Sequence, residues 1–152
     1  FPSVRSDDKL VDAMAFDILR NPQKYDVIVT TNMFGDILSD EAAGIAGSLG
    51  LAPSLNYGEN YAMAQAVHGS APDIAGKGIA NPIATILSSS MLLEWLGHRN
   101  KDLSLVKMSD MIRVAVRKTI KKRENLTPDI GGNGNTKTVT ASIISNIEGA
   151  LK

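Results

Sequence analysis

The sequence predicts an α/β protein, because short apolar runs typical of strands alternate with segments of helical periodicity. The run 27–31 begins with three β-branched apolar residues and reads as a short buried strand. The segment 6–20 before it repeats apolar residues at helical spacing, and the small residues of 42–49 after it predict a tightly packed helix. A second short strand is expected at 63–67.

Composition narrows the class of protein. The 152 residues match the length of one ordinary domain, and a hydrophobic content of 43% is enough for a real core. Basic and acidic residues balance at 16 each, so nothing suggests nucleic acid or a polyanionic surface as a partner. The longest apolar run, 83–96, contains three serines and Glu94, which makes it too short and too polar for a membrane span.

The lack of cysteine excludes a disulfide framework and thiolate chemistry, and it fits an intracellular protein. No signal peptide is found. The chain begins at Phe1 rather than at Met, and we expect it to be part of a longer protein. We expect that protein in the cytoplasm, or in the mitochondrial matrix if its source is eukaryotic.

The first expected helix begins near Ser6, which can cap it, with Asp7 and Asp8 in its first turn. Its buried face is formed by apolar residues at helical spacing, namely Val11, Met14, Ala15 and Ile18. Asp12 interrupts this pattern and, taken alone, reads as a solvated helix acid. Asn21 and Pro22 end the helix.

The segment 32–40 follows the first strand and carries Asp36 and Asp40, four residues apart. On a helix this spacing places both carboxylates on one face as neighbours, where they repel each other unless a positive charge lies between them. Mg²⁺ and Mn²⁺ favour oxygen ligands and would supply that charge. A solvated first turn, whose acids complement the helix dipole, explains the same spacing. Spacing alone leaves both readings open.

The stretch 68–82 contains three glycines, two prolines and turn-forming residues throughout. It follows a segment, 54–60, that is expected to be a loop. Such a stretch exposes backbone N–H groups and suits close contact with a ligand, although a long surface loop is the alternative. It is not a GxGxxG motif after a strand, so the Rossmann fingerprint is absent.

The remaining sequence predicts helices. Asn81 caps a mostly buried helix with Pro82 at its first position, Trp95 is a core anchor, and Gly97 ends it. After a polar loop at 98–104, an amphipathic helix covers 108–120, and its basic face reads as solvated rather than as a binding patch. A second glycine-rich loop occupies 127–134. The final helix runs from Thr138 to about Ala150 and buries three residues: Ala141, Ile144 and Ile147.

Several of these segments, in this order, resemble the β-decarboxylating dehydrogenases, which include the isopropylmalate, isocitrate, homoisocitrate and tartrate dehydrogenases. The resemblance is carried by 32–40, 47–54, 68–76, 79–82 and 129–132, so it covers essentially the whole chain. It implies the C-terminal portion of an isocitrate/isopropylmalate dehydrogenase-like two-domain fold. Residues 1–46 would belong to the central dimerisation and metal-binding domain, and 47–152 to the cofactor-binding domain.

The resemblance also implies a reaction and its site. An (R)-2-hydroxy acid would be oxidised by hydride transfer to a nicotinamide and would then lose its β-carboxylate. Metal ligands are expected at Asp36 and Asp40 for one site of a homodimer, and at Asp12 for the partner's site. The positions expected to bind NAD are His68, Gly69, Ser70, Ala71, Asp73, Ile74, Asn81 and Asp129. No catalytic residue is identified, because the catalytic tyrosine, the catalytic lysine and the substrate-binding arginines are expected upstream.

The resemblance further implies that Asp73 is the acid that accepts hydrogen bonds from the adenosine ribose. Together with Ile74 and Pro128 it would favour NAD over NADP, because the acid repels a 2′-phosphate. The sequence departs from the family at Ala64-Gln65-Ala66, where a glutamate is common, at 55–57 and at 133–135. Two alternatives are a non-catalytic regulatory subunit of a hetero-oligomeric isocitrate dehydrogenase, which tends to lose metal ligands, and a nucleotide-binding module without chemistry. The fragment alone is expected to be inactive.

Overall fold

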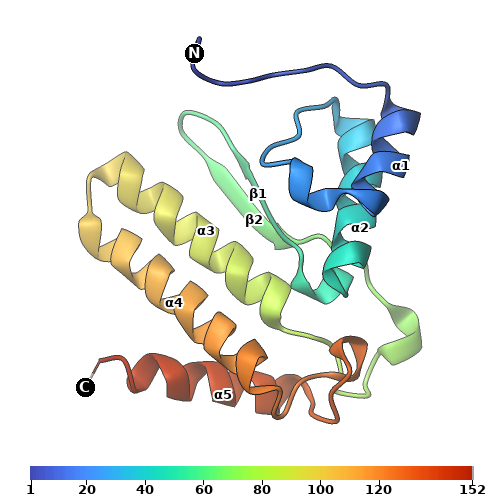
Figure 1. Cartoon of the computed structure of the whole chain (residues 1–152). Coiled ribbons are helices and arrows are strands. Elements are labelled where there is room, and N and C mark those ends of the chain that lie inside the picture. Colours follow the sequence, from blue (N-terminus) through green and yellow to red (C-terminus); the bar gives the residue numbers. More distant parts are fainter. Residues whose placement is uncertain (152) are drawn as a thin grey trace. The chain divides into compact units, whose positions relative to one another are not determined.

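The computed structural model describes residues 1–151 and contains both helices and strands (Figure 1). The chain divides into two compact units, one from Phe1 to Ala46 and one from Gly47 onward. Gly47 has φ +119°, a conformation that glycine adopts without strain, and it ends the last helix of the first unit. The functional roles expected for these ranges stay predictions. No helix in the described residues is long and apolar enough to cross a membrane.

The first unit packs α1 (Val11–Arg20) against α2 (Asn32–Ala46). Its core contains Met14, Ile18 and Leu38, with half-buried apolar neighbours around them. The predicted apolar face of the first helix is therefore confirmed. Its predicted start is wrong, because α1 begins at Val11 after Leu10 in an extended conformation, and no side chain caps it. Short polar side chains such as those of 6–8 bond readily to nearby backbone outside helices, which disfavours an earlier start.

The predicted buried strand at 27–31 is also wrong for this chain. These residues form neither a strand nor a helix, and the side chains of Val27 and Val29 are 80% and 91% exposed. A strand is stabilised by a hydrogen-bonded neighbour, and none is available to this segment within the described residues. The apolar pattern is thus present without the sheet that would bury it.

The second unit begins with a hairpin of β1 (Pro53–Tyr57) and β2 (Ala62–Ala66), paired antiparallel with Pro53 opposite Ala66. The second predicted strand is confirmed with a one-residue shift, but the predicted loop at 54–60 is wrong, because most of it is β1. Helix α3 (Ile83–Asn100) packs on the hairpin. Its buried Ser88 hydroxyl donates to the Gln65 carbonyl at 2.7 Å and fixes this contact.

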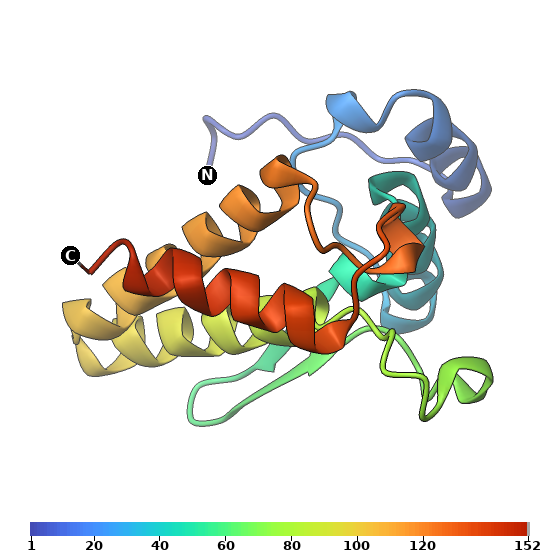
Figure 2. The same ribbon diagram turned by 90° about the horizontal axis from the view of Figure 1, so that it is seen from below.

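Helices α3, α4 (Leu103–Lys122) and α5 (Thr136–Glu148) pack in sequence, α3 on α4 and α4 on α5 (Figures 1 and 2). The core between them consists of Ile83, Ala115, Val116, Val139 and Ile143. The predicted buried face of the last helix is wrong by position, since Ala141 and Ile144 are exposed and only Ile147 is partly buried. Helix α5 begins at Thr136, two residues earlier than expected, and Asn135 caps it. Its buried face is therefore formed by Val139, Ile143 and Ile147, which follow one another every four residues.

Gly97 does not end α3, which continues to Asn100. A Cβ at Gly97 would lie 2.7 Å from Val106 Cγ2 and 2.9 Å from the Asp102 carbonyl oxygen. Gly97 therefore permits the close approach of α4, and Lys101 in the left-handed conformation ends the helix. The loop predicted at 98–104 is too long, because only two residues separate α3 from α4. Trp95 is half-buried rather than a buried core anchor, so that prediction is wrong. The Arg99 guanidinium lies over its ring, 5.5 Å from the ring centre.

Candidate functional site

The three predicted metal ligands all lie in the first unit. Asp36 and Asp40 stand one turn apart on α2, on the side opposite the buried Leu38, and both are exposed. Asp12 is exposed on the first turn of α1, where its Oδ1 accepts a hydrogen bond from the Ala13 N–H at 2.8 Å. Within the described residues no three acidic or histidine side chains come together as a metal site. The structure thus brings Asp36 and Asp40 together but does not add Asp12 to them, and all three assignments stay predictions.

Sequence reasoning missed a cluster in the same unit, in which Lys9 and Tyr25 both contact the Asp17 carboxylate. The Lys9 Nζ is also 2.5 Å from the Tyr25 hydroxyl, and Asn21 Nδ2 donates to Asp17 Oδ1 at 2.7 Å. Lys9 lies before the start of α1, and its side chain reaches back to Tyr25. Lys9 is eight residues from Asp17 and 16 from Tyr25, and neither separation matches a helix or strand repeat that the sequence could reveal.

This lysine–tyrosine pair is unsuited to proton abstraction. The hydrogen bond from Lys9 to Asp17 holds the pKa of the ammonium above its usual range, with a further contribution from Tyr25. The same bond, followed by those from Tyr25 and Asn21, holds the pKa of Asp17 below its usual range. A lysine whose protonated form is favoured is a poor general base, so this cluster leaves the general base unassigned. The contacts of Lys9 with Asp17 and Tyr25 hold the segment before α1 against the first unit.

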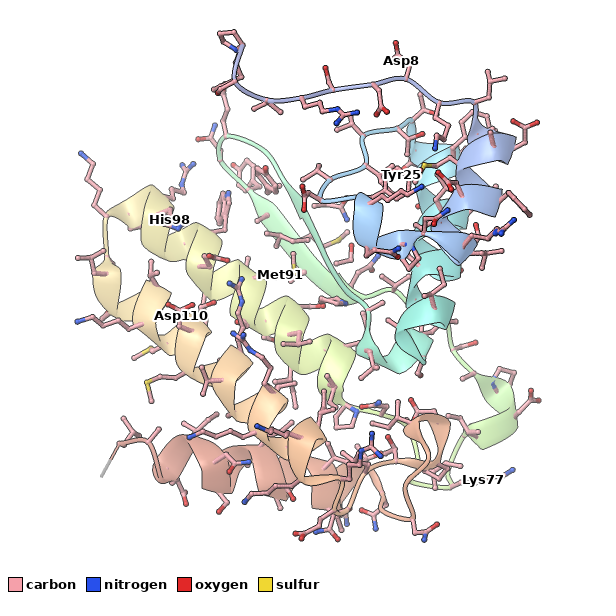
Figure 3. The ribbon with its side chains drawn as sticks, viewed as in Figure 1. Asp8, Tyr25, Lys77, Met91, His98 and Asp110 are labelled. Atoms are coloured by element: carbon pink, nitrogen blue, oxygen red, sulfur yellow. The ribbon has the colours of Figure 1, made fainter. Side chains whose placement is uncertain are left out.

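In the second unit, the stretch 68–82 is a loop with one 3-10 turn, Pro72–Ile74. His68, Gly69, Ser70, Ala71 and Asp73 are exposed on it, and Ile74 is partly buried. The bonds of residues 68–77 are local ones, such as Ala75 N–H to the Pro72 carbonyl at 3.2 Å, and Lys77 projects from the loop in Figure 3. The exposed backbone predicted for this stretch is confirmed, and its role in binding NAD stays a prediction.

The end of this loop is anchored by side chains from other elements. Thr136, at the start of α5, donates its backbone N–H to the Gly78 carbonyl at 2.9 Å. Its hydroxyl lies 3.0 Å from the same carbonyl and 2.5 Å from the Ala80 carbonyl. No motif in the sequence pointed to Thr136, because this contact spans more than 50 residues.

Asn81 and Asp129, both predicted to bind the cofactor, are brought together here. Asn81 is only 7% exposed; its Nδ2 donates to Asp129 Oδ2 at 3.0 Å, and its Oδ1 accepts from the Ile83 N–H at 3.0 Å. Asn81 therefore bonds to the first N–H of α3, but the predicted cap position is one residue too early, since α3 begins at Ile83 and Pro82 occupies the N-cap. Ser48 also donates to Asp129 Oδ2, at 2.5 Å. Sequence reasoning gave Ser48 no role, although it lies in the motif 47–54.

Gly50 lies against this cluster, where a Cβ would be 2.7 Å from Asn81 Cβ and 3.0 Å from Asp129 Oδ2. The close packing affects the charge on Asp129. Desolvation raises the pKa of this carboxyl, but the hydrogen bonds from Ser48 and Asn81, together with the nearby Thr127 hydroxyl, outweigh it and lower the pKa below its usual value. Thr127 is fully buried, and its hydroxyl has no partner within hydrogen-bond geometry among the described residues. Asp129 is thus held ionised where three separate chain segments meet.

Known proteins resemble this chain in both sequence and fold. Residues 1–147 match the model of the isocitrate/isopropylmalate dehydrogenase family. Over 99% of its length the chain is 51% identical to homoisocitrate dehydrogenase of Methanocaldococcus jannaschii, and over 97% it is 46% identical to 3-isopropylmalate dehydrogenase of Aquifex aeolicus. A crystal structure of isocitrate dehydrogenase from Methylococcus capsulatus matches 97% of the chain with a TM-score of 0.88 at 42% identity.

The chain spans 41% and 40% of the lengths of those two curated relatives, and 42% of the crystallised chain. The predicted α/β fold and the predicted resemblance are both confirmed by these matches. The chain therefore belongs to the isocitrate/isopropylmalate dehydrogenase family.

Proposed function

We propose that the complete protein is a β-decarboxylating dehydrogenase that oxidises an (R)-2-hydroxy acid with NAD and Mg²⁺ or Mn²⁺. The observation that carries the proposal is the pair of exposed, neighbouring carboxylates, Asp36 and Asp40, on α2 of a chain that matches this family along its length. Neither carboxylate takes part in an ion pair of the described residues, so both remain available to a ligand.

The donor set fits a hard divalent cation, since carboxylate oxygens are its preferred ligands. When bound, such a cation acidifies the substrate hydroxyl and stabilises the negative charge that develops during decarboxylation. Asp36 and Asp40 would hold it from one helix, with spacing fixed by the helical turn. We propose that Asp12, which is exposed on the first turn of α1, serves the second site of a homodimer.

The second unit would bind the dinucleotide. Residues 68–74 offer exposed backbone groups and the Asp73 carboxylate, while Asn81 and Asp129 fix the end of the loop. We propose that Asp73 accepts hydrogen bonds from the adenosine ribose, which favours NAD over NADP. This chain would therefore bind, orient and select the cofactor, and proton transfer would fall to residues outside it.

A non-catalytic regulatory subunit is the second candidate. Such a subunit would keep the exposed loop 68–82 for binding a nucleotide and would turn over no hydroxy acid. Against it stands the retention of all three aspartates, because a subunit without catalysis has no need of metal ligands.

The test is a turnover assay of the complete protein. NADH formation is followed with isocitrate, homoisocitrate, 3-isopropylmalate and tartrate, in Mn²⁺ and in chelator. We expect NADH formation with at least one of these acids, and only with the metal present. Binding of NAD without turnover of any of them would favour the regulatory subunit.

A further inference from the structure

Three segments distant in the sequence meet at one carboxylate oxygen in the second unit. Asp129 Oδ2, in the turn Pro128–Ile130, receives the Ser48 hydroxyl at 2.5 Å and the Asn81 amide at 3.0 Å. The separations along the chain are 81 and 48 residues. Such convergence holds the turn at 49–51, the end of the loop 68–82 and the turn at 128–130 in one arrangement.

The two side chains that bond to Asp129 each have a second hydrogen-bond partner in the backbone. The Ser48 hydroxyl accepts the Gly50 N–H at 2.9 Å, and Asn81 Oδ1 accepts the Ile83 N–H. The Asn81 amide can satisfy both bonds in one orientation only, with Nδ2 toward Asp129 and Oδ1 toward α3. Ser48 thus helps to determine which way a nearly buried amide points at the end of the loop.

We propose that Ser48 is a positioning residue for dinucleotide binding, which acts through Asp129 on Asn81 and touches no part of the dinucleotide. This inference rests on the proposed function, since it presumes that the loop 68–82 binds NAD. Removing the hydroxyl leaves the Asp129 carboxylate held by fewer donors and lets it turn, so the Asn81 amide loses its fixed partner. The local bonds of 68–77 would not compensate, because they do not reach this cluster.

Two other roles for Ser48 make different predictions. If Ser48 touched the dinucleotide, its loss would weaken NAD binding whether or not Asp129 were present. If it served only to hold the turn Leu49–Leu51, its loss would lower stability and leave the affinity for NAD unchanged. A double-mutant cycle separates these roles, because residues that act in one chain have non-additive effects.

The experiment uses the complete protein and the variants Ser48→Ala, Asp129→Ala and the double variant, with Asp129→Asn in case Asp129→Ala fails to fold. The KM for NAD, kcat and the melting temperature are measured for each. Ser89→Ala is the matched control, because its hydroxyl bonds to the Thr85 carbonyl of its own helix. We expect Ser48→Ala to raise the KM for NAD about three- to tenfold, the range of one net hydrogen bond, with kcat and the control unchanged.

In the Asp129→Ala background, Ser48→Ala should add no further change in KM, and Ser48→Thr should restore most of the affinity in the otherwise unchanged protein. An additive rise in KM would overturn the inference, as would a loss of stability with unchanged KM. These outcomes are distinct from failure of the proposed function, in which the unchanged protein itself reduces no NAD and the inference falls with it.

Discussion

Gly97→Ala tests how closely α3 and α4 approach each other. In an open helix interior this change stabilises by about 1 kcal/mol, because alanine has the higher helix propensity. Here the new Cβ would meet Val106 Cγ2 at 2.7 Å, the Asp102 carbonyl at 2.9 Å and the Val106 nitrogen at 3.0 Å. Two of these three atoms belong to the backbone and cannot be relieved by a rotamer change. Overpacking of this kind costs about 1–3 kcal/mol or more, so we expect net destabilisation.

The assay is thermal and urea unfolding of the complete protein and of the variant. Gly58→Ala is the control, because nothing lies within 4 Å of a Cβ at Gly58 and its backbone is not left-handed. We expect the control to change stability by less than about 0.5 kcal/mol, as surface substitutions usually do. Adding Val106→Ala should recover only part of the loss, since both backbone contacts remain. A melting temperature for Gly97→Ala equal to or above that of the unchanged protein would refute the reasoning.

The other predictions concern the cofactor, Asp129 and the isolated chain. The complete protein should show a higher kcat/KM with NAD than with NADP, and Asp73→Lys with Ile74→Tyr should shift that ratio toward NADP; an initial preference for NADP would contradict the reading. The lowered pKa of Asp129 means that its stabilising contribution is present above the pKa of the unfolded chain and is lost as pH falls through the lowered value. Carboxyl NMR should show this pKa rising in Ser48→Ala, whereas an unchanged value would remove Ser48 as its donor. The 152-residue chain alone should form no NADH from any of the four acids and should self-associate, because Val27 and Val29 expose apolar surface; metal-dependent NADH formation by a monomer would show that acid–base groups lie within it.

The helices could largely be predicted because their signals are local. Met14 and Ile18 repeat at helical spacing, Asn21 and Pro22 end α1, and Asn81 bonds to the first N–H of α3. Where the sequence misled, tertiary contacts overrode the local signal. Glycine often ends a helix, but the lack of a side chain at Gly97 instead lets α4 pack closely against α3.

The failed strand at 27–31 has a different cause. Its pattern of apolar β-branched residues is typical of a buried strand, but burial requires neighbouring strands, and the described residues supply none to it. Conversely, β1 was missed because Ser54 and Asn56 carry little strand propensity, and the pairing with β2 forms it.

The candidate site divides in the same way. Asp36 and Asp40 could be placed on one face from spacing alone, and Asp73 lies in the exposed loop where its glycine-rich surroundings indicated. Ser48 and Thr136 could not be found, since each contacts its partner across more than 50 residues. The meeting of Asn81 with Asp129 likewise depends on the packing of η4 (Pro128–Ile130) beside the start of α3.

The most direct test of the central claim is titration of Mn²⁺ into the complete, chelator-treated protein and its Asp36→Asn variant, with calorimetry and NADH formation measured on the same samples. Asp110→Asn, which changes an exposed acid of α4, is the control (Figure 3). We predict that Asp36→Asn weakens Mn²⁺ binding and turnover together, while the control binds and reacts as the unchanged protein does. Undiminished turnover by Asp36→Asn in metal-free buffer would contradict the account.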